Sequence, residues 1–205
     1  MNNQPHFTSA TDKVGPRRAS VSLALVHWPI YDRAKNTVCT NVTNFDVHDI
    51  ARAARSYGLD DYFIVNRIPE QLMFVSRMLE HWRLGEGAKY NPMRRTALGM
   101  VKTARFLEEV ISSYETPPMV VATTARKIPH LTPLSFRSLR QQIAENAENR
   151  PILLVFGTGF GLHDDVFEMC HGTLEPIMGA APDEYRHLSV RSAVSICLDR
   201  LLGAW

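Results

Sequence analysis

The chain has 205 residues, of which 45% are hydrophobic, and it carries 23 Lys and Arg against 21 Asp and Glu. This composition indicates one folded domain and excludes disordered, collagenous and coiled-coil chains, while a net charge of +2 does not by itself indicate nucleic-acid binding. The longest unbroken apolar run, Ile152 to Phe156, is far shorter than the roughly 20 residues of a membrane-spanning helix, so a membrane span is excluded.

The N-terminus and the cysteines indicate a cellular compartment. Residues 1–20 lack the apolar stretch of a secretion signal, so we expect a loose tail followed by one domain over residues 21–205. Cys39, Cys170 and Cys197 cannot all pair within one chain, and they form no C-x-x-C motif. We therefore expect a cytoplasmic protein.

Along the chain, short apolar runs alternate with segments of helical period. Strands are expected at Val21 to His27, Tyr62 to Val65, Met119 to Ala122 and Ile152 to Phe156, with a fifth before Leu174. Helices are expected over Asp46 to Tyr57, with Gly58 at its C-terminal end, around Leu72 to Trp82, and over Arg94 to Ile111, Ser135 to Glu148 and Ser189 to Leu202. Nearly continuous apolar strands are typical of parallel sheets covered on both faces. The pattern predicts an α/β fold with a mostly parallel sheet and helices on both faces.

The strand that ends at Phe156 runs directly into Gly157, Gly159 and Gly161. Glycines allow unusual backbone angles and let main-chain groups approach a ligand. A dinucleotide fingerprint would require a further glycine where Leu162 stands, which disfavours an NAD-type dehydrogenase, and a phosphate-binding P-loop would require a lysine, none of which follows Lys127. Two interpretations remain: a loop that holds a nucleoside without phosphates, and a tight turn without a ligand.

Two later loops favour the ligand-binding interpretation. Leu174-Glu175-Pro176-Ile177 follows the fifth strand, and His187-Leu188-Ser189-Val190-Arg191 opens the last helix. Ligands bind at the carboxyl ends of strands in open parallel sheets, so the three loops are expected to form one pocket.

The segments FGTGFGL, LEPI and HLSVRSAVSICLDRL resemble the three cofactor loops of the SPOUT superfamily of RNA methyltransferases, which bind S-adenosylmethionine. Asn41-Val42-Thr43-Asn44 and the helix from Asp46 to Gly58 resemble the first motif of that superfamily. From about Val21 to Trp205 the chain is similar to an uncharacterised family related to the C-terminal domain of tRNA (guanine-N1)-methyltransferases.

The resemblance implies a deep C-terminal trefoil knot, which general folding rules disfavour, and a homodimer with cofactor sites near the subunit interface. It also implies which residues bind the cofactor: Thr123, Thr124, Gly157, Thr158, Gly159, Phe160, Gly161, Leu162, Leu174, Glu175, Pro176, Ile177, Leu188, Ser189 and Val190. Many relatives carry an acidic residue between the glycines, where this chain has Thr158 and Phe160. We expect the cofactor site to persist, because backbone atoms make most of that contact.

Methyl transfer is an in-line displacement that needs alignment and, for some acceptors, removal of a proton. By resemblance to the ribose-methylating branch, Arg52 is the catalytic candidate, although it could instead pair with Asp49. By resemblance to the guanine-methylating branch, the candidates are Asp164, Asp165 and Asp183, by position only. Glu175 is expected either to face the sulfonium or amino group of the cofactor or to cap a loop.

A basic stripe offers a candidate RNA-binding surface. Lys89 precedes the expected helix, and Arg94, Arg95, Lys102 and Arg105 fall in one sector of it, which suits contacts to phosphates or an ordinary solvated face. His163, Cys170, His171 and His187 match no zinc-binding pattern, so no metal is expected. The sequence predicts an S-adenosylmethionine-dependent methyltransferase of tRNA or rRNA. The alternative is a catalytically silent knotted module that binds RNA or protein.

Overall fold

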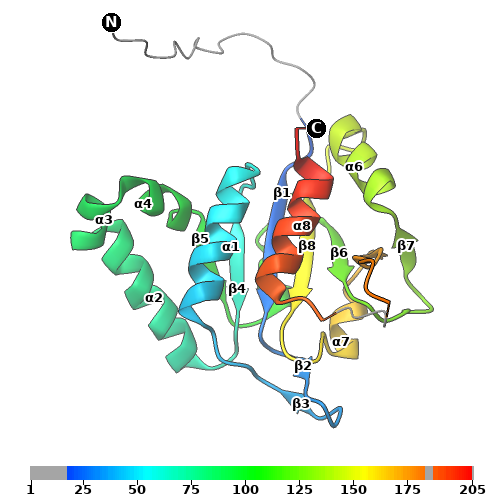
Figure 1. The fold of residues 1–205 in the computed structure, drawn as a ribbon, viewed down its shortest axis with the longest axis horizontal. Helices are drawn as coiled ribbons and strands as arrows, with labels where there is room; N and C mark the ends of the chain where they lie inside the picture. Colours follow the sequence, from blue (N-terminus) through cyan, green and yellow to red (C-terminus); the bar gives the residue numbers. More distant parts are fainter. Residues whose placement is uncertain (1–17, 183–186, 205) are drawn as a thin grey trace, which may run out of the picture.

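A seven-stranded sheet, in which every paired neighbour runs parallel, organises the chain. The computed structural model describes residues 18–182 and 187–204 (Figure 1). The strand order is β5-β4-β1-β8-β6-β9-β7. The bounds are Val21–Val26 for β1, Tyr62–Val65 for β4, Val101–Ala104 for β5, Met119–Thr123 for β6, Thr132–Leu134 for β7, Ile152–Gly157 for β8 and Gly172–Leu174 for β9. The predicted mostly parallel α/β class is confirmed.

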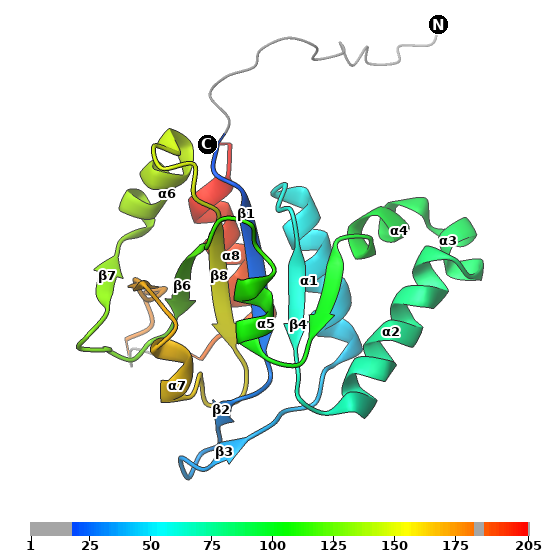
Figure 2. The ribbon, with the colours of Figure 1, turned by 180° about the vertical axis from the view of Figure 1, so that it is seen from behind.

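Helices cover both faces of this sheet. Figure 1 shows α1 (Asn44–Ser56) and α8 (Val190–Leu202) in front of the strands, with α2 (Pro69–Arg83) and α6 (Phe136–Glu145) beside them toward the two edges of the sheet. The buried apolar residues of these four helices belong to one core. The opposite view shows α5 (Leu107–Ser112) and α7 (Asp164–Phe167) on the other side (Figure 2). The short helices α3 (Glu86–Tyr90) and α4 (Pro92–Leu98) extend from α2, and β2 (Ile30–Tyr31) pairs antiparallel with β3 (Thr37–Val38).

The central strand β1 shows why the sheet needs two helical layers. All of its residues are buried. Leu23 and Leu25 belong to the core beneath α1, α6 and α8, whereas Ala24 and Val26 belong to the core beneath α5 and α7. Because successive side chains of a strand point to opposite faces, a continuous apolar strand must be covered on both sides.

The expected helix from Arg94 to Ile111 is wrong, because this segment forms α4, β5 and α5. Gly99 lowers helix propensity where α4 ends, and the β-branched Val101 and Thr103 pair with β4 at the edge of the sheet. The guanidinium of Arg83 donates hydrogen bonds to the carbonyls of Leu98 and Gly99, which fixes this change of direction. Pairing with β4 therefore outweighed a locally helical pattern.

The other expected elements match those observed, within a few residues at their ends. Gly58 follows α1 with a φ of +67°, the left-handed conformation that suits glycine after a helix. Most of the expected N-terminal tail, residues 1–17, lies outside the described residues. Within the described residues, no helix is long and apolar enough to span a membrane.

Candidate functional site

A pocket of about 740 Å³ lies at the carboxyl ends of β1, β6, β8 and β9 and at the start of α8. Loops that are distant in the sequence meet there, as the parallel-sheet rule predicts. All of the residues expected to bind the cofactor, apart from Leu162, line this pocket. The lining also includes His27, Thr40, Asn41, Thr43, Asp46, Ala125, Arg126, Phe156, His187, Ala193 and Cys197.

Leu162 does not line the pocket, so its expected place there is wrong. Its side chain is 2% exposed and packs in the core beneath α5 and α7. Its carbonyl accepts a hydrogen bond of 2.6 Å from Nη2 of Arg126. An apolar residue at the end of the glycine loop anchors that loop to the core, because its burial is favourable.

The glycine loop needs its glycines for two different reasons. A Cβ atom on Gly157 would lie 2.9 Å from both the backbone nitrogen and Cγ of Leu162, so no side chain fits where β8 ends. Gly159 and Gly161 have φ of +56° and +103°, which other residues adopt at a cost. The loop therefore presents its main chain to the pocket at close range.

A chain of hydrogen bonds joins this loop to β1. The Thr158 hydroxyl donates its only hydrogen to the carbonyl of Val26 (3.2 Å). Its oxygen therefore accepts a hydrogen bond from the Thr40 hydroxyl, which lies 2.6 Å away. Thr40 Oγ1 then accepts from Nδ1 of His27 at 2.9 Å, which leaves Nε2 as a lone-pair acceptor. Nε2 is buried and has no hydrogen-bond partner among the described residues. Burial lowers the pKa of His27 to about 4, against the opposing charge of Asp46, so the imidazole is neutral at pH 7.

Among the described residues, Asp46 and Glu175 are the acidic side chains of the pocket lining, and both are held by the protein. The Thr43 hydroxyl donates to Asp46 Oδ2 at 2.6 Å, and Nε of Arg191 lies 3.5 Å from Oδ1. Glu175 Oε1 accepts a 2.6 Å hydrogen bond from the backbone N–H of Phe136, the first residue of α6. Of the two interpretations of Glu175, the structure therefore shows the loop cap, while the residue also lines the pocket.

The catalytic candidates lie elsewhere. Arg52 is exposed on α1 and is not a lining residue; Asp49, its suggested partner, pairs with Arg191 at 3.1 Å. Asp164 pairs with Arg126 at 3.1 Å, and neither it nor Asp165 lines the pocket. Asp183 lies outside the described residues.

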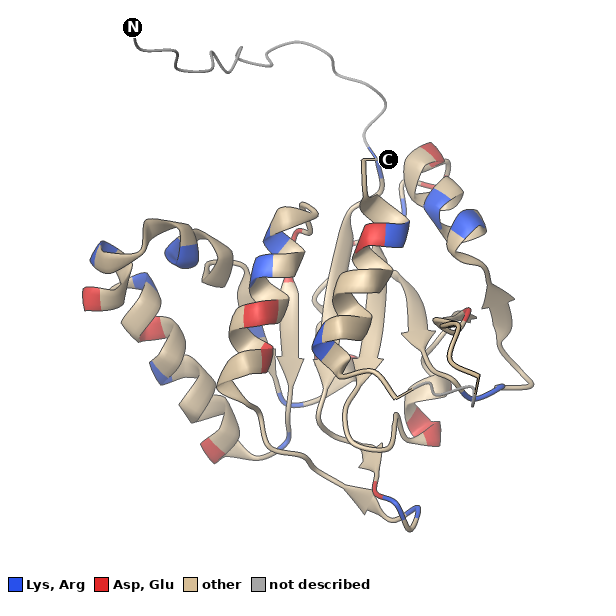
Figure 3. Cartoon of the chain, in the orientation of Figure 1, with Lys and Arg blue, Asp and Glu red and all other residues tan. Residues whose placement is uncertain are grey.

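The expected single-helix stripe of basic residues is not present, because its members stand on α3, α4, β5 and the turn after β5. Lys89 pairs with Glu86, and Lys102 with Asp61, both at 2.8 Å. The guanidinium carbons of Arg94 and Arg105 lie 4.4 and 5.5 Å from the ring centroids of Trp82 and Phe106, and Arg95 is exposed. Figure 3 shows acidic and basic positions interspersed on α1 and α2 rather than gathered into one basic face.

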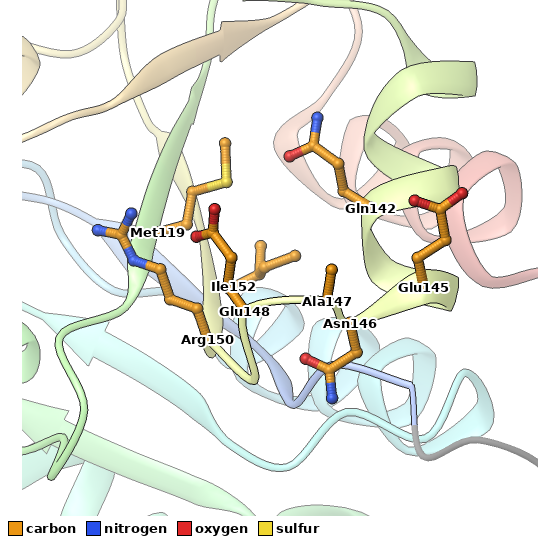
Figure 4. Close-up of a pocket in the computed structure, with 8 residues that line it drawn as sticks. All are labelled: Met119, Gln142, Glu145, Asn146, Ala147, Glu148, Arg150 and Ile152. Carbon is orange, nitrogen blue, oxygen red and sulfur yellow. The ribbon is translucent and has the colours of Figure 1, made fainter.

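A second, smaller hollow of about 220 Å³ lies at the opposite, amino ends of β6 and β8. Figure 4 shows that its lining comes from α6, the loop after it and the starts of these two strands. The guanidinium of Arg150 there donates to the carbonyls of Pro117 and Pro118. Within residues 18–182 and 187–204, no group of three or more His, Cys, Asp or Glu is arranged to hold a metal ion.

Sequence reasoning missed His27, Thr40, Asp46 and Arg126 as pocket residues. His27 ends the first expected strand, and Arg126 follows the third. The rule that ligands bind at carboxyl ends of parallel strands selects both positions, so the signal was present. Asp46 lies at the start of α1, whose first turn reaches the pocket.

A family model of SAM-dependent RNA methyltransferases matches residues 20–203. The chain belongs to this family. The chain is 40% identical over 184 residues to a tRNA (guanine-N(1)-)-methyltransferase of Nitratidesulfovibrio vulgaris, covering 88% of this chain and 41% of the relative. It is also 40% identical over 188 residues to an uncharacterized protein of Aquifex aeolicus, covering 90% of this chain and 89% of that one. The chain thus spans less than half the length of the tRNA methyltransferase that it matches.

Solved structures show the same fold. A putative methylase family protein from Neisseria gonorrhoeae aligns with a TM-score of 0.62 and 18% identity, covering 95% of this chain and 86% of that chain. The SpoU methyltransferase AviRb from Streptomyces viridochromogenes, in complex with AdoMet, aligns with a TM-score of 0.50 and 14% identity, covering 92% of this chain and 59% of that chain. These likenesses confirm the predicted fold. Membership of a SAM-dependent family confirms the expected cofactor, S-adenosylmethionine.

Proposed function

We propose that the methyltransferase binds S-adenosylmethionine in the pocket at the carboxyl ends of β6, β8 and β9 and methylates a nucleotide of tRNA or rRNA presented at its mouth. The convergence of the glycine loop, the loop after β9 and the start of α8 on one pocket carries this proposal. The name of the tRNA methyltransferase relative favours tRNA.

The residues of the pocket fit this cofactor. Its volume of about 740 Å³ lies within the range of small-molecule sites, roughly 300–1,000 Å³. Phe156, Leu174 and Ile177 supply apolar walls for a purine, and the glycine loop supplies main-chain donors and acceptors. When bound, the cofactor supplies an activated methyl group. The protein would orient it and exclude water, and the fixed carboxylate of Asp46 would favour its positive charge.

Calorimetric titration with S-adenosylhomocysteine tests binding, and nucleoside mass spectrometry tests chemistry. We expect saturable binding, and the loss of one methylated nucleoside from tRNA or rRNA when the gene is deleted. Absence of heat at millimolar ligand would contradict the proposal. Binding of ligand and RNA without methylation of any RNA would instead indicate the silent binding module.

We further propose that two copies pair through α1 and α8, and that the C-terminal segment forms the trefoil knot of SPOUT relatives. Two observations support the pairing. Phe45, at the start of α1, is 63% exposed, with the Arg191 guanidinium 5.3 Å from its ring centroid. Arg52 on the same helix is exposed and makes no ion pair with any described residue. Such a dimer would let Arg52 act in the pocket of its partner, while Lys89, Arg94 and Arg95 contact RNA phosphates.

Subunit complementation tests the placement of Arg52. We expect Arg52→Ala and Gly157→Ala each to lose activity alone, because one lacks the arginine and the other the cofactor cradle. When both variants are co-expressed, about half of the dimers are mixed, and each mixed dimer contains one intact site out of two. Co-expression should therefore restore about a quarter of wild-type methyl incorporation. If Arg52 acts within its own subunit, mixing restores nothing. Size-exclusion chromatography with light scattering measures the dimer directly.

A further inference from the structure

Phe160 lines the pocket, in the middle of the glycine loop, and the residue is 60% exposed. We propose that this ring is the platform on which the target base of the RNA stacks, while the main chain of the same loop contacts the cofactor. The inference rests on the proposed function and assigns the position of the substrate within it.

The backbone around Phe160 is fixed on both sides. Its N–H donates to the carbonyl of Tyr31 at 3.1 Å, and the carbonyl of Gly161 accepts from the N–H of Tyr31 at 2.9 Å. Gly159 and Gly161, which flank it, have positive φ angles, so the chain turns sharply and directs the residue between them outward. These hydrogen bonds hold the backbone of Phe160 in place, so the Cα–Cβ bond that carries the ring has a fixed direction.

A second set of contacts supports the loop from behind. Arg126 donates to the carbonyl of Leu162 at 2.6 Å and pairs with Asp164 at 3.1 Å. Its guanidinium carbon also lies 5.4 Å from the centroid of the Tyr31 ring. The loop is thus connected to β2, to the end of β6 and to the start of α7, which makes Phe160 a preorganised surface.

Single exposed apolar side chains are common, so exposure alone does not indicate a partner. Phe160 differs from Phe74 on α2, which is 44% exposed but does not line the pocket. Leu188 at the start of α8 lines the same pocket and is 46% exposed, so two separate segments contribute apolar surface there. An aromatic face beside a methyl-donor site suits the flat face of a base.

The platform also restricts the class of substrate. A base inside a duplex already stacks on its neighbours, so it can reach a side-chain platform only from a loop, a bulge or an extruded position. Stacking uses the face that every base has, so Phe160 would select an accessible base rather than a particular one. We infer an unpaired or extruded nucleotide as the substrate.

The test compares Phe160→Leu with Phe160→Trp, using total RNA from a strain that lacks the gene and S-adenosylmethionine labelled in its methyl group. For Phe160→Leu we expect kcat/KM for RNA to fall about 10-fold to 100-fold, the size of a base-stacking contribution. Phe160→Trp should remain within about threefold of the wild type because it keeps an aromatic face. The Kd for S-adenosylhomocysteine should change less than about twofold in both, because the main chain is unaltered.

Phe74→Leu is the matched control, since it removes a similarly exposed ring outside the pocket, and it should leave kcat/KM unchanged. Thermal unfolding checks that each variant is folded. Phe160→Leu with wild-type activity would overturn the platform, and so would a parallel loss of S-adenosylhomocysteine affinity, which would assign the ring to the cofactor. A wild-type protein that binds no S-adenosylhomocysteine would overturn the proposed function itself.

Discussion

Gly157→Ala is expected to weaken S-adenosylhomocysteine binding about 10-fold to 100-fold and to lower the free energy of unfolding by about 1–3 kcal/mol. The new methyl group would lie 2.9 Å from the backbone nitrogen of Leu162, and a backbone atom cannot rotate away as a side chain can. Either β8 or the turn must shift, and both shape the pocket. Calorimetric titration and chemical denaturation measure the two effects.

Gly179→Ala is the matched control for this substitution. A Cβ atom there meets nothing within 4 Å, and Gly179 does not line the pocket. Both the affinity and the free energy of unfolding should stay at their wild-type values. Unchanged affinity in Gly157→Ala would show that the glycine loop does not hold the cofactor.

The second large effect is a pH dependence caused by His27. Burial lowers the pKa of this residue from 6.5 to about 4, so the unfolded chain binds a proton that the folded protein excludes between these values. Above pH 6.5 His27 is neutral in both states, and the folded protein has its full stability. As the pH falls toward 4, the unfolded chain takes up the proton and the free energy of unfolding decreases. At about 1.4 kcal/mol for each pKa unit, the loss approaches about 3 kcal/mol.

A difference measurement isolates this contribution. His27→Asn should be less stable than the wild type near pH 7, because it leaves a cavity. The difference in the free energy of unfolding should narrow as the pH falls to 4, because only the wild type loses stability through His27. The other titratable groups are the same in both proteins, so their effects on the pH dependence of the free energy of unfolding cancel in the difference. A gap that stays constant between pH 7 and pH 4 would show that His27 is not a buried neutral group.

The sequence was most informative where one signal dominated. The continuous apolar runs of β1, β4, β6 and β8 predicted parallel strands covered on both sides, and the glycines after β8 marked a loop of the pocket. The rule that ligands bind at the carboxyl ends of parallel strands pointed to the loop after β9 and the start of α8, and the resemblance to SPOUT proteins assigned their residues to the cofactor. These features are local, so short windows of sequence contain them.

The features that were not predicted depend on distant contacts. β5 pairs at the edge of the sheet, and Arg83 fixes the turn before it, so local helical periodicity was misleading between Arg94 and Ile111. Burial of Leu162 depends on the core beneath α5 and α7. The hydrogen bonds from His27 through Thr40 to Thr158 join segments that only the fold brings together.

The pairing of β1 with β8, which joins Val21 to Ile152, has a consequence for biosynthesis. β1 leaves the ribosome long before β8, so it must wait until the chain has been made as far as Ile152 before it gains its second neighbour in the sheet. Until then it exposes an apolar edge that other nascent chains can join. Because folding slows as contacts become more distant in sequence, we expect late, slow acquisition of the native state and a dependence on chaperones during translation.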